Sequence, residues 1–320
     1  MPTFIETLPA STTVFFSGIE DTQFEDVRQL SLVDAWICAE AAALTYKDDA
    51  FIVELGVKLR PELWQVRTFS EGPTSAILIC RDGIAILAFR GTRVVAFPDI
   101  LRKAPIDFQD LTTDFSIALM KHPKRGLVHA GFFGAYTRFW AIHGKEILDL
   151  TAHRSLFVTG HSLGAAIATV AARDLELVRA LYTFGSPRVG DAEFQAGFID
   201  IGLPVYRFVH EYDLVATVPL EEMNYRHVGD MLHIKGEGKA VHLATADRQH
   251  TVFDSLTQGV TVAPTFLVEA ARFIVQHIGK LDLENAPVPD VALAQHAPWN
   301  YSTKLKALKA GARGNDGNGP

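Results

Sequence analysis

The sequence has little cysteine and no cluster of basic residues interleaved with aromatic ones. Its two cysteines, Cys38 and Cys80, lie in apolar segments without the spacing of metal ligands, so we expect buried free thiols and no disulfide framework. The missing basic cluster and a formal net charge of -7 argue against nucleic acid as a partner. The composition thus disfavours a disulfide-rich scaffold and a nucleic-acid-binding module.

Long apolar runs are also missing, and none could cross a bilayer. The first residues lack the basic start and the continuous apolar region of a secretory signal. We therefore expect a cytoplasmic protein without a transmembrane segment, although export by a route without such a signal would leave no trace in the sequence.

The chain of 320 residues, 48% of them hydrophobic, is long enough to bury a large core. We expect one domain over residues 1–280 and a C-terminal extension over residues 281–320 that is rich in Ala, Pro, Asn and Gly. The last residues have no periodicity and almost no apolar side chains, which predicts disorder at the end of the extension.

The apolar segments predict an α/β fold. A helix with Ser31 as its N-cap should come first. Strand-like runs between residues 63 and 89 are joined by short turns, which is typical of antiparallel hairpins. From residue 156 on, buried strands alternate with helical segments, as in a parallel sheet with crossover helices. We therefore expect a mostly parallel mixed sheet flanked by helices, with antiparallel hairpins on its N-terminal side.

One stretch, LFVTGHSLGAAIATVAA at residues 156–172, contains the pattern G-x-S-x-G between an apolar strand and an apolar helix. In a nucleophile elbow the two glycines let strand and helix approach closely, and the serine lies strained at the apex. Ser162 is therefore the candidate nucleophile. The alternative is a tight turn that merely contains a serine.

A serine hydroxyl becomes a good nucleophile when a histidine takes its proton and a carboxylate orients that histidine. In proteins with a nucleophile elbow, the acid comes after the serine in the sequence, and the histidine comes after the acid. Asp213, a few residues after the strand-like run 205–209, is the preferred acid. Asp191 and Glu211 are the alternatives.

Half of the twelve histidines lie late enough in the chain to be the base. They are His227, His233, His242, His250, His277 and His296. The first two lie in strand-like sequence, His277 lies in a helix and His296 in the extension, where we expect structural or solvated histidines. His250 follows a polar stretch and opens a helical segment, so it is the preferred base, with His242 as the alternative.

Attack on an ester carbonyl creates an oxyanion that preorganised N–H donors stabilise. The backbone N–H of Leu163, directly after the nucleophile, is the first expected donor. The second should follow an earlier strand, where Gly91 permits close approach and Thr92 can donate. The other interpretation of this FRGT segment is a strand end with a turn.

Four blocks occur in a fixed order: FRGT (residues 89–92), VHAGFFGAY (128–136), VTGHSLGAA (158–166) and TFGSPRVGD (183–191). Together with RFVHEYDLVATVP (207–219) they resemble the class 3 lipases, the α/β-hydrolase family of fungal triacylglycerol lipases and their bacterial and plant relatives.

The resemblance implies an α/β-hydrolase fold in which Ser162 is the nucleophile, Asp213 the triad acid, and Thr92 with Leu163 the oxyanion hole. The segment RQHTVFDSL is similar to the histidine motif of the family, which favours His250. The TFGSPRVGD block resembles a core strand and turn, which implies a structural Asp191.

Taken together, these features predict a serine hydrolase that cleaves carboxylic esters of lipids through an acyl-enzyme, as a triacylglycerol lipase or a carboxylesterase. The chemistry requires no metal and no organic cofactor. Alternatives are a phospholipase or lysophospholipase with the same triad, and a non-catalytic hydrolase-like scaffold. The expected partner is a lipid or other ester, in solution or at a lipid–water interface. Residues 94–101, apolar between charged flanks, are a candidate lid or a loop packed on the core.

Overall fold

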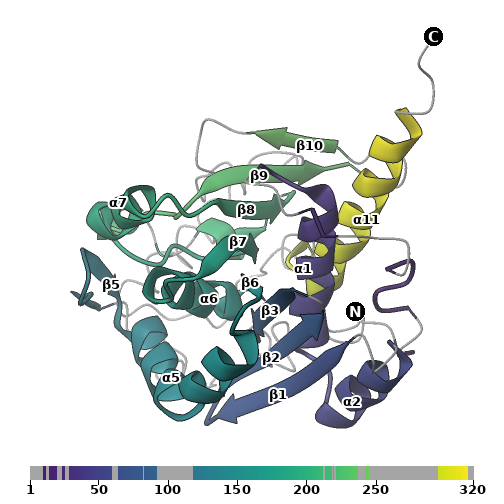
Figure 1. The fold of residues 1–320 in the computed structure, drawn as a ribbon. Helices are drawn as coiled ribbons and strands as arrows, with labels where there is room; N and C mark the ends of the chain where they lie inside the picture. The colour runs from purple at the N-terminus through teal and green to yellow at the C-terminus, as the bar shows by residue number, and fades with distance from the viewer. Residues whose placement is uncertain are drawn as a thin grey trace, which may run out of the picture.

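A mixed sheet of eight strands forms the centre of the fold, with helices on both faces (Figure 1). This computed structural model describes residues 10–11, 14–19, 24–25, 29–59, 64–81, 83–91, 118–211, 213–217, 219, 221–236, 242–245 and 295–315. The strand order across the sheet is β1-β2-β3-β6-β7-β8-β9-β10. The strands are β1 (Gln65–Glu71), β2 (Thr74–Arg81), β3 (Ile84–Phe89), β6 (Ser155–His161), β7 (Val178–Phe184), β8 (Val205–His210), β9 (Asp230–Lys235) and β10 (His242–Thr245).

The middle of the sheet is parallel and its two sides are antiparallel. β1, β2 and β3 form consecutive antiparallel pairs, as the short turns between them predict. The strands from β3 through β6, β7 and β8 to β9 pair in parallel, and β10 returns antiparallel to β9. β6 is buried along nearly its whole length because helices cover both faces, whereas the edge strand β1 exposes part of its length. The predicted α/β-hydrolase fold with a mixed sheet is confirmed.

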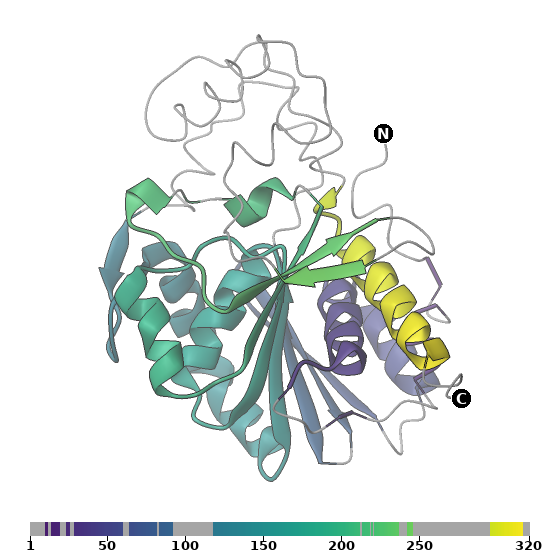
Figure 2. The ribbon, with the colours of Figure 1, turned by 90° about the horizontal axis from the view of Figure 1, so that it is seen from above.

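Helices cover the two faces in two groups, which Figure 2 separates clearly. One group is α1 (Leu32–Leu44), α2 (Asp49–Lys58) and α11 (Pro298–Asn315). The other is α5 (Ala130–Thr151), α6 (Leu163–Asp174) and α7 (Ala192–Asp200). Each face has its own hydrophobic core, the first around Trp36, Phe157 and Tyr301, and the second around Phe139 and Ile167. The parallel strands therefore lie between two independent apolar layers.

Short elements complete the described part of the chain. A separate hairpin of β4 (Leu119–Lys121) and β5 (Leu127–His129) precedes α5, and the 3-10 helices η1 (Leu214–Thr217) and η2 (Glu221–Met223) follow β8. Ser31 caps α1 as predicted, since its Oγ accepts a hydrogen bond from the backbone N–H of Asp34 at 3.0 Å. None of the described helices is both long and apolar enough to cross a membrane.

Both cysteines are buried free thiols, as predicted. Burial raises the pKa of the Cys38 thiol well above its ordinary value, and it also raises the pKa of the Cys80 thiol. A thiol held protonated is a poor nucleophile, so both residues serve the core as small apolar groups.

The described part of the C-terminal segment, residues 295–315, packs against the domain. Helix α11 packs against α1, and its residues Tyr301 and Leu305 are fully buried. The buried carboxylate of Glu40, on α1, accepts hydrogen bonds from Ser302 Oγ at 2.6 Å and from Trp36 Nε1 at 3.1 Å. The expected boundary after residue 280 is therefore wrong for residues 295–315, because two apolar side chains one helical turn apart are enough to dock a mostly polar helix. Residues 316–320, where we expect disorder, lie outside the described residues.

We expect Leu305→Ala to lower the free energy of unfolding by about 2–5 kcal/mol, because it leaves a cavity between α11 and α1. Urea unfolding followed by circular dichroism measures this. The matched control is Leu177→Ala, whose leucine is 80% exposed and should contribute less than about 0.5 kcal/mol. Equal stability of the two variants would contradict the assignment of α11 to the domain core.

Candidate active site

The turn between β6 and α6 has the geometry of a nucleophile elbow. Ser162 lies at its apex with φ 60° and ψ -129°, a strained conformation for a residue with a side chain. A Cβ atom at Gly160 would collide with the backbone of Gly164, and one at Gly164 would collide with the end of β3. Both glycines are therefore required for the close approach of strand and helix that the sequence predicts.

The Ser162 side chain makes no capping hydrogen bond to α6. Its backbone N–H donates to the carbonyl of Phe184 on β7 at 3.0 Å, which holds the apex against the sheet. Leu163 is the first residue of α6, so its backbone N–H belongs to the free N-terminal turn of that helix. The elbow thus places a hydroxyl beside an electropositive helix end.

The end of β3 lies directly against the elbow. A Cβ atom at Gly91 would lie 2.7 Å from the carbonyl oxygen of His161, and one at Gly164 would lie 2.8 Å from the nitrogen of Gly91. Thr92, the expected second oxyanion donor, follows Gly91 but lies outside the described residues, as do residues 94–101, the candidate lid. Of the expected FRGT segment, the structure describes the residues as far as Gly91.

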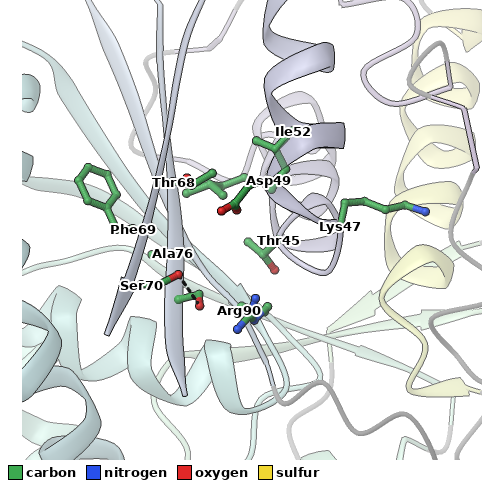
Figure 3. Close-up of a pocket in the computed structure, with 11 residues that line it drawn as sticks. Thr45, Lys47, Asp49, Ile52, Thr68, Phe69, Ser70, Ala76 and Arg90 are labelled. Carbon is green, nitrogen blue, oxygen red and sulfur yellow. Dashed lines mark hydrogen bonds between the residues drawn. The ribbon is translucent and has the colours of Figure 1, made fainter. Parts of the chain in front are cut away.

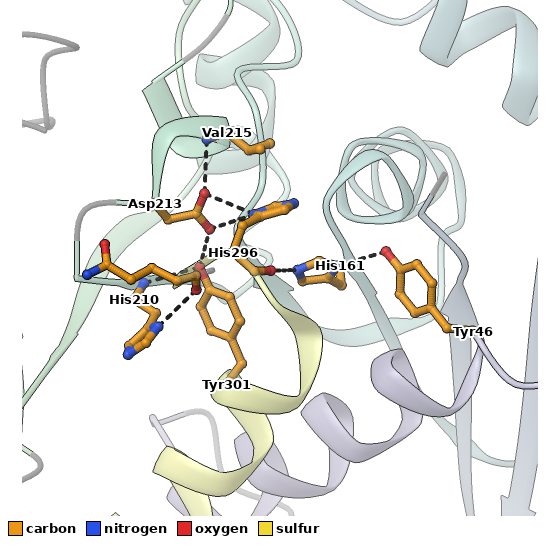
Figure 4. Close-up of polar contacts among 8 residues, drawn as sticks. Tyr46, His161, His210, Asp213, Val215, His296 and Tyr301 are labelled. Atoms are coloured by element: carbon orange, nitrogen blue, oxygen red, sulfur yellow. Dashed lines mark hydrogen bonds and ion pairs between the residues drawn. The ribbon is translucent and has the colours of Figure 1, made fainter. Parts of the chain in front are cut away.

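Asp213 follows β8 and is 1% exposed (Figure 4). Its carboxylate accepts hydrogen bonds from His296 Nδ1 at 2.7 and 2.9 Å, from Tyr301 Oη at 2.5 Å and from the backbone N–H of Val215 at 2.9 Å. Burial by itself raises the pKa of Asp213, but the attraction of His296 and the hydrogen bonds from His296 and Tyr301 outweigh it and hold the pKa below its ordinary value. Asp213 is therefore a carboxylate at neutral pH.

The alternative acids have other partners. Asp191 caps α7 through Phe194 N at 2.8 Å and also accepts from Leu127 N at 2.9 Å, which is a structural role. The carboxylate of Glu211 accepts a hydrogen bond from the backbone N–H of Gly236 at 2.6 Å. Of these three carboxylates, Asp213 is the one that binds a histidine.

That histidine is His296 and not the expected His250. His296 is 4% exposed, whereas we expected it in a solvated tail. His250 lies outside the described residues, and the carboxylate with which we expected it to pair is occupied by His296. The pairing escaped prediction because the docking of α11, which begins two residues after His296, brings together groups 83 residues apart in the chain. The available signal was Pro298, two residues after His296, because proline is favoured at the first position of a helix.

Two other histidines have structural roles, as expected. His227 Nε2 donates to the carbonyl of Ala216 at 2.7 Å, and His233 Nε2 donates to the carbonyl of Glu211 at 2.7 Å. His242 lies in β10. His277 lies outside the described residues.

The hydrogen bonds of His296 to Asp213 define the orientation of the imidazole ring. Nδ1 must carry a proton to donate to the Asp213 carboxylate, so Nε2 is the ring nitrogen left for proton exchange with another group. This Nε2 atom is buried and has no hydrogen-bond partner within the described part of the chain. The ring lies against that of His161, the residue before Ser162, with 4.4 Å between the ring centroids. A proton acceptor oriented by a carboxylate thus lies next to the elbow.

Tyr301 and Gly185 help to hold the pair of Asp213 and His296 in place. Tyr301 Oη donates to Asp213 and accepts from the backbone N–H of His210 at 3.1 Å. Gly185, at the end of β7 with φ 57°, leaves the space that the pair occupies, because a Cβ atom there would lie 2.6 Å from Asp213 Oδ2 and 2.8 Å from His296 Nδ1. The pair therefore sits in a site shaped for it.

A small pocket near the end of β3 is separate from this pair (Figure 3). Its lining comes from the end of α1, from α2 and from β1 and β2, and it includes Thr45, Ser70 and Arg90 but neither Ser162 nor Asp213. Among the described residues, no group of His, Cys, Asp and Glu side chains could hold a metal ion.

Residues 86–223 match the model of the family Lipase (class 3). A lipase from Rhizopus niveus is 32% identical over 174 residues, which are 50% of this chain and 41% of the relative. Secreted mono- and diacylglycerol lipase A from Penicillium camembertii is 39% identical over 107 residues, 32% of this chain and 34% of the relative. Phospholipase A1-Igamma1, chloroplastic, from Arabidopsis thaliana is 31% identical over 166 residues, 42% of this chain and 31% of the relative. The chain thus spans less than half the length of these relatives.

Solved structures share the fold. Lipase II from Rhizopus niveus superposes with a TM-score of 0.54 at 24% identity, covering 71% of this chain and 94% of that structure. The Rhizomucor miehei lipase propeptide complex gives 0.55 at 22% identity, covering 70% and 78%.

The expected cytoplasmic location is wrong. Relatives that match this chain are named secreted mono- and diacylglycerol lipases, from Penicillium camembertii and from Malassezia globosa, and they point to an extracellular location. The expectation rested on the missing secretory signal, which is an argument from absence.

The Asp213 pKa predicts how acid destabilises the protein. Because the folded-state pKa lies below the ordinary value of 3.8, the unfolded chain takes up the proton first as the pH falls. The stabilisation is full above the ordinary pKa and is lost as the pH falls through the folded-state pKa. We expect Asp213→Asn to flatten the fall in unfolding free energy between about pH 6 and about pH 3, measured with urea.

Asp149→Asn is the control, since that carboxylate is 65% exposed in a surface ion pair. It should lose stability in acid as the wild type does. An equally steep loss in Asp213→Asn would contradict the assigned charge state of the pair.

Proposed function

Since its residues 86–223 match the model of the class 3 lipase family, we propose that this protein is a serine hydrolase that cleaves carboxylic esters of lipids through an acyl-enzyme. The observation that carries the proposal is the buried pair of Asp213 and His296 beside the strained Ser162 of the elbow. The names of the relatives support acylglycerols as substrates and an extracellular site of action.

In the proposed mechanism Ser162 Oγ attacks the ester carbonyl carbon while His296 Nε2 takes its proton. Asp213 holds the ring through Nδ1 and stabilises the imidazolium that forms. The backbone N–H of Leu163 stabilises the oxyanion, and Thr92 remains the proposed source of the second donor. His296 then protonates the leaving alcohol, and water attacks the acyl-enzyme by the same route. Protein groups alone supply every step, so the mechanism requires no cofactor.

A phospholipase is the second candidate, because the relative from Arabidopsis thaliana is a phospholipase A1. The same triad would attack either kind of ester, since the reacting carbonyl is the same in both. Binding of the alcohol part of the substrate therefore distinguishes the two candidates, and substrate profiling separates them.

We expect Ser162→Ala and His296→Ala each to lower kcat on p-nitrophenyl esters of graded acyl length by at least about 10³-fold, because the nucleophile or its base is gone. His250→Ala is the matched control and should stay within a few-fold of the wild type. Release of fatty acid from tributyrin and from phosphatidylcholine vesicles separates lipase from phospholipase.

Loss of activity in His250→Ala with retention in His296→Ala would overturn the assigned base. A well-folded wild-type protein that hydrolyses none of these esters would overturn the proposed function and favour a non-catalytic scaffold.

A further inference from the structure

A buried chain of hydrogen bonds runs from the end of α1 to the base histidine (Figure 4). Tyr46 Oη lies 2.7 Å from His161 Nδ1, and His161 Nε2 lies 2.6 Å from the backbone carbonyl oxygen of His296. Tyr46 is 3% exposed and His161 is fully buried. These two side chains belong to none of the catalytic roles described above, yet they contact both the elbow and the base.

The direction of each hydrogen bond in this chain is fixed. The carbonyl of His296 can only accept, so His161 Nε2 carries a proton and donates. Burial lowers the pKa of His161 well below its ordinary value, which keeps the ring neutral and leaves Nδ1 as an acceptor. The hydroxyl of Tyr46 therefore donates to Nδ1. Tyr46 selects the one tautomer of His161 that can hold the carbonyl of His296.

The same hydroxyl also contacts the end of β3. Tyr46 Oη packs directly against Gly91, because a Cβ atom at Gly91 would lie 2.1 Å from that oxygen. Gly91 directly precedes Thr92, the proposed second oxyanion donor. Tyr46 Oη thus contacts both Gly91 and His161.

We propose that Tyr46 and His161 are positioning residues that hold Gly91 at the end of β3, the nucleophile and the base in one fixed arrangement. His161 connects two of these parts, because its backbone leads into Ser162 and its side chain holds the backbone of His296. Tyr46 connects His161 to Gly91. The inference rests on the proposed ester hydrolysis, since a fixed distance between base and nucleophile matters for that chemistry. Misplacement of reacting groups by about 1 Å can cost about 10²-fold in rate.

A merely structural role makes a different prediction. If the chain of hydrogen bonds only stabilised the fold, its loss would lower the melting temperature and leave the turnover of the folded protein unchanged. If it positions the catalytic groups, its loss lowers kcat while KM changes little, because both side chains are buried and out of reach of a substrate in solvent. A loss of kcat in the folded protein at unchanged KM therefore indicates a positioning role, and a loss of melting temperature alone indicates a structural one.

The first experiment compares Tyr46→Phe with Tyr182→Phe. Tyr182 is 1% exposed and lies in the same core, so its substitution removes an equally buried hydroxyl away from the site. We expect Tyr46→Phe to lower kcat about 10- to 100-fold with KM within about twofold, and Tyr182→Phe to retain the kcat of the wild type. The rate of inactivation by a p-nitrophenyl alkylphosphonate should fall in parallel with kcat, because that reaction also needs the oriented serine and base.

The second experiment tests the contact to the carbonyl of His296 by rescue. His161→Gln keeps a side-chain N–H that can reach this carbonyl, whereas His161→Leu of similar size cannot donate. We expect His161→Leu to lose about 100-fold in kcat and His161→Gln to recover about tenfold of that loss.

Equal kcat values in Tyr46→Phe and Tyr182→Phe, or in the two His161 variants, would overturn the inference while the wild-type activity upheld the proposed function. A wild-type protein that neither hydrolyses esters nor reacts with the phosphonate would overturn both.

Discussion

The buried pair of Asp213 and His296 is the interaction on which the rest of the site depends. A carboxylate that is almost fully removed from water is stable only when its oxygens have donors, and here they come from His296, Tyr301 and Val215. Two of these three residues belong to the last described segment of the chain. In the proposed mechanism, the middle of the sequence thus supplies the nucleophile and the acid, and the C-terminal segment supplies the base that joins them.

This division explains why α11 is anchored so firmly. Leu305 and Tyr301 pack against α1, and Ser302 donates to the buried carboxylate of Glu40, so the helix has one defined position on the sheet. Burial raises the pKa of Glu40 in spite of the hydrogen bonds that it accepts from Ser302, Phe16 and Trp36. The helices on one face of the sheet, α1 and α11, thereby hold the proposed base, while the opposite face packs against the elbow helix α6. The elbow lies where the two layers meet.

The parts of the site that local sequence encodes were predictable, and the parts that depend on long-range packing were not. Ser162 lies in a pattern whose glycines are needed by the turn itself, and Asp213 follows a recognisable buried strand. His296 has no local mark that distinguishes it from His250, because its role arises only when α11 docks. Tyr46 likewise resembles an ordinary core residue at the end of an apolar helix, since a sequence does not show which group meets a buried hydroxyl.

The strained backbone of Ser162 and the buried carboxylate of Asp213 are both stabilised by contacts from several separate elements of the fold. The positive φ of Ser162 costs about 1–3 kcal/mol and persists because the surroundings leave the serine no alternative. Its N–H is held by Phe184 on β7, and Gly164 lets the helix pack against the end of β3. The Asp213 carboxylate is held in the same way, by donors from separate elements. Each group therefore keeps its geometry because several independent parts of the fold would have to move together to release it. In the proposed mechanism this rigidity places the Leu163 donor and the base before the substrate arrives.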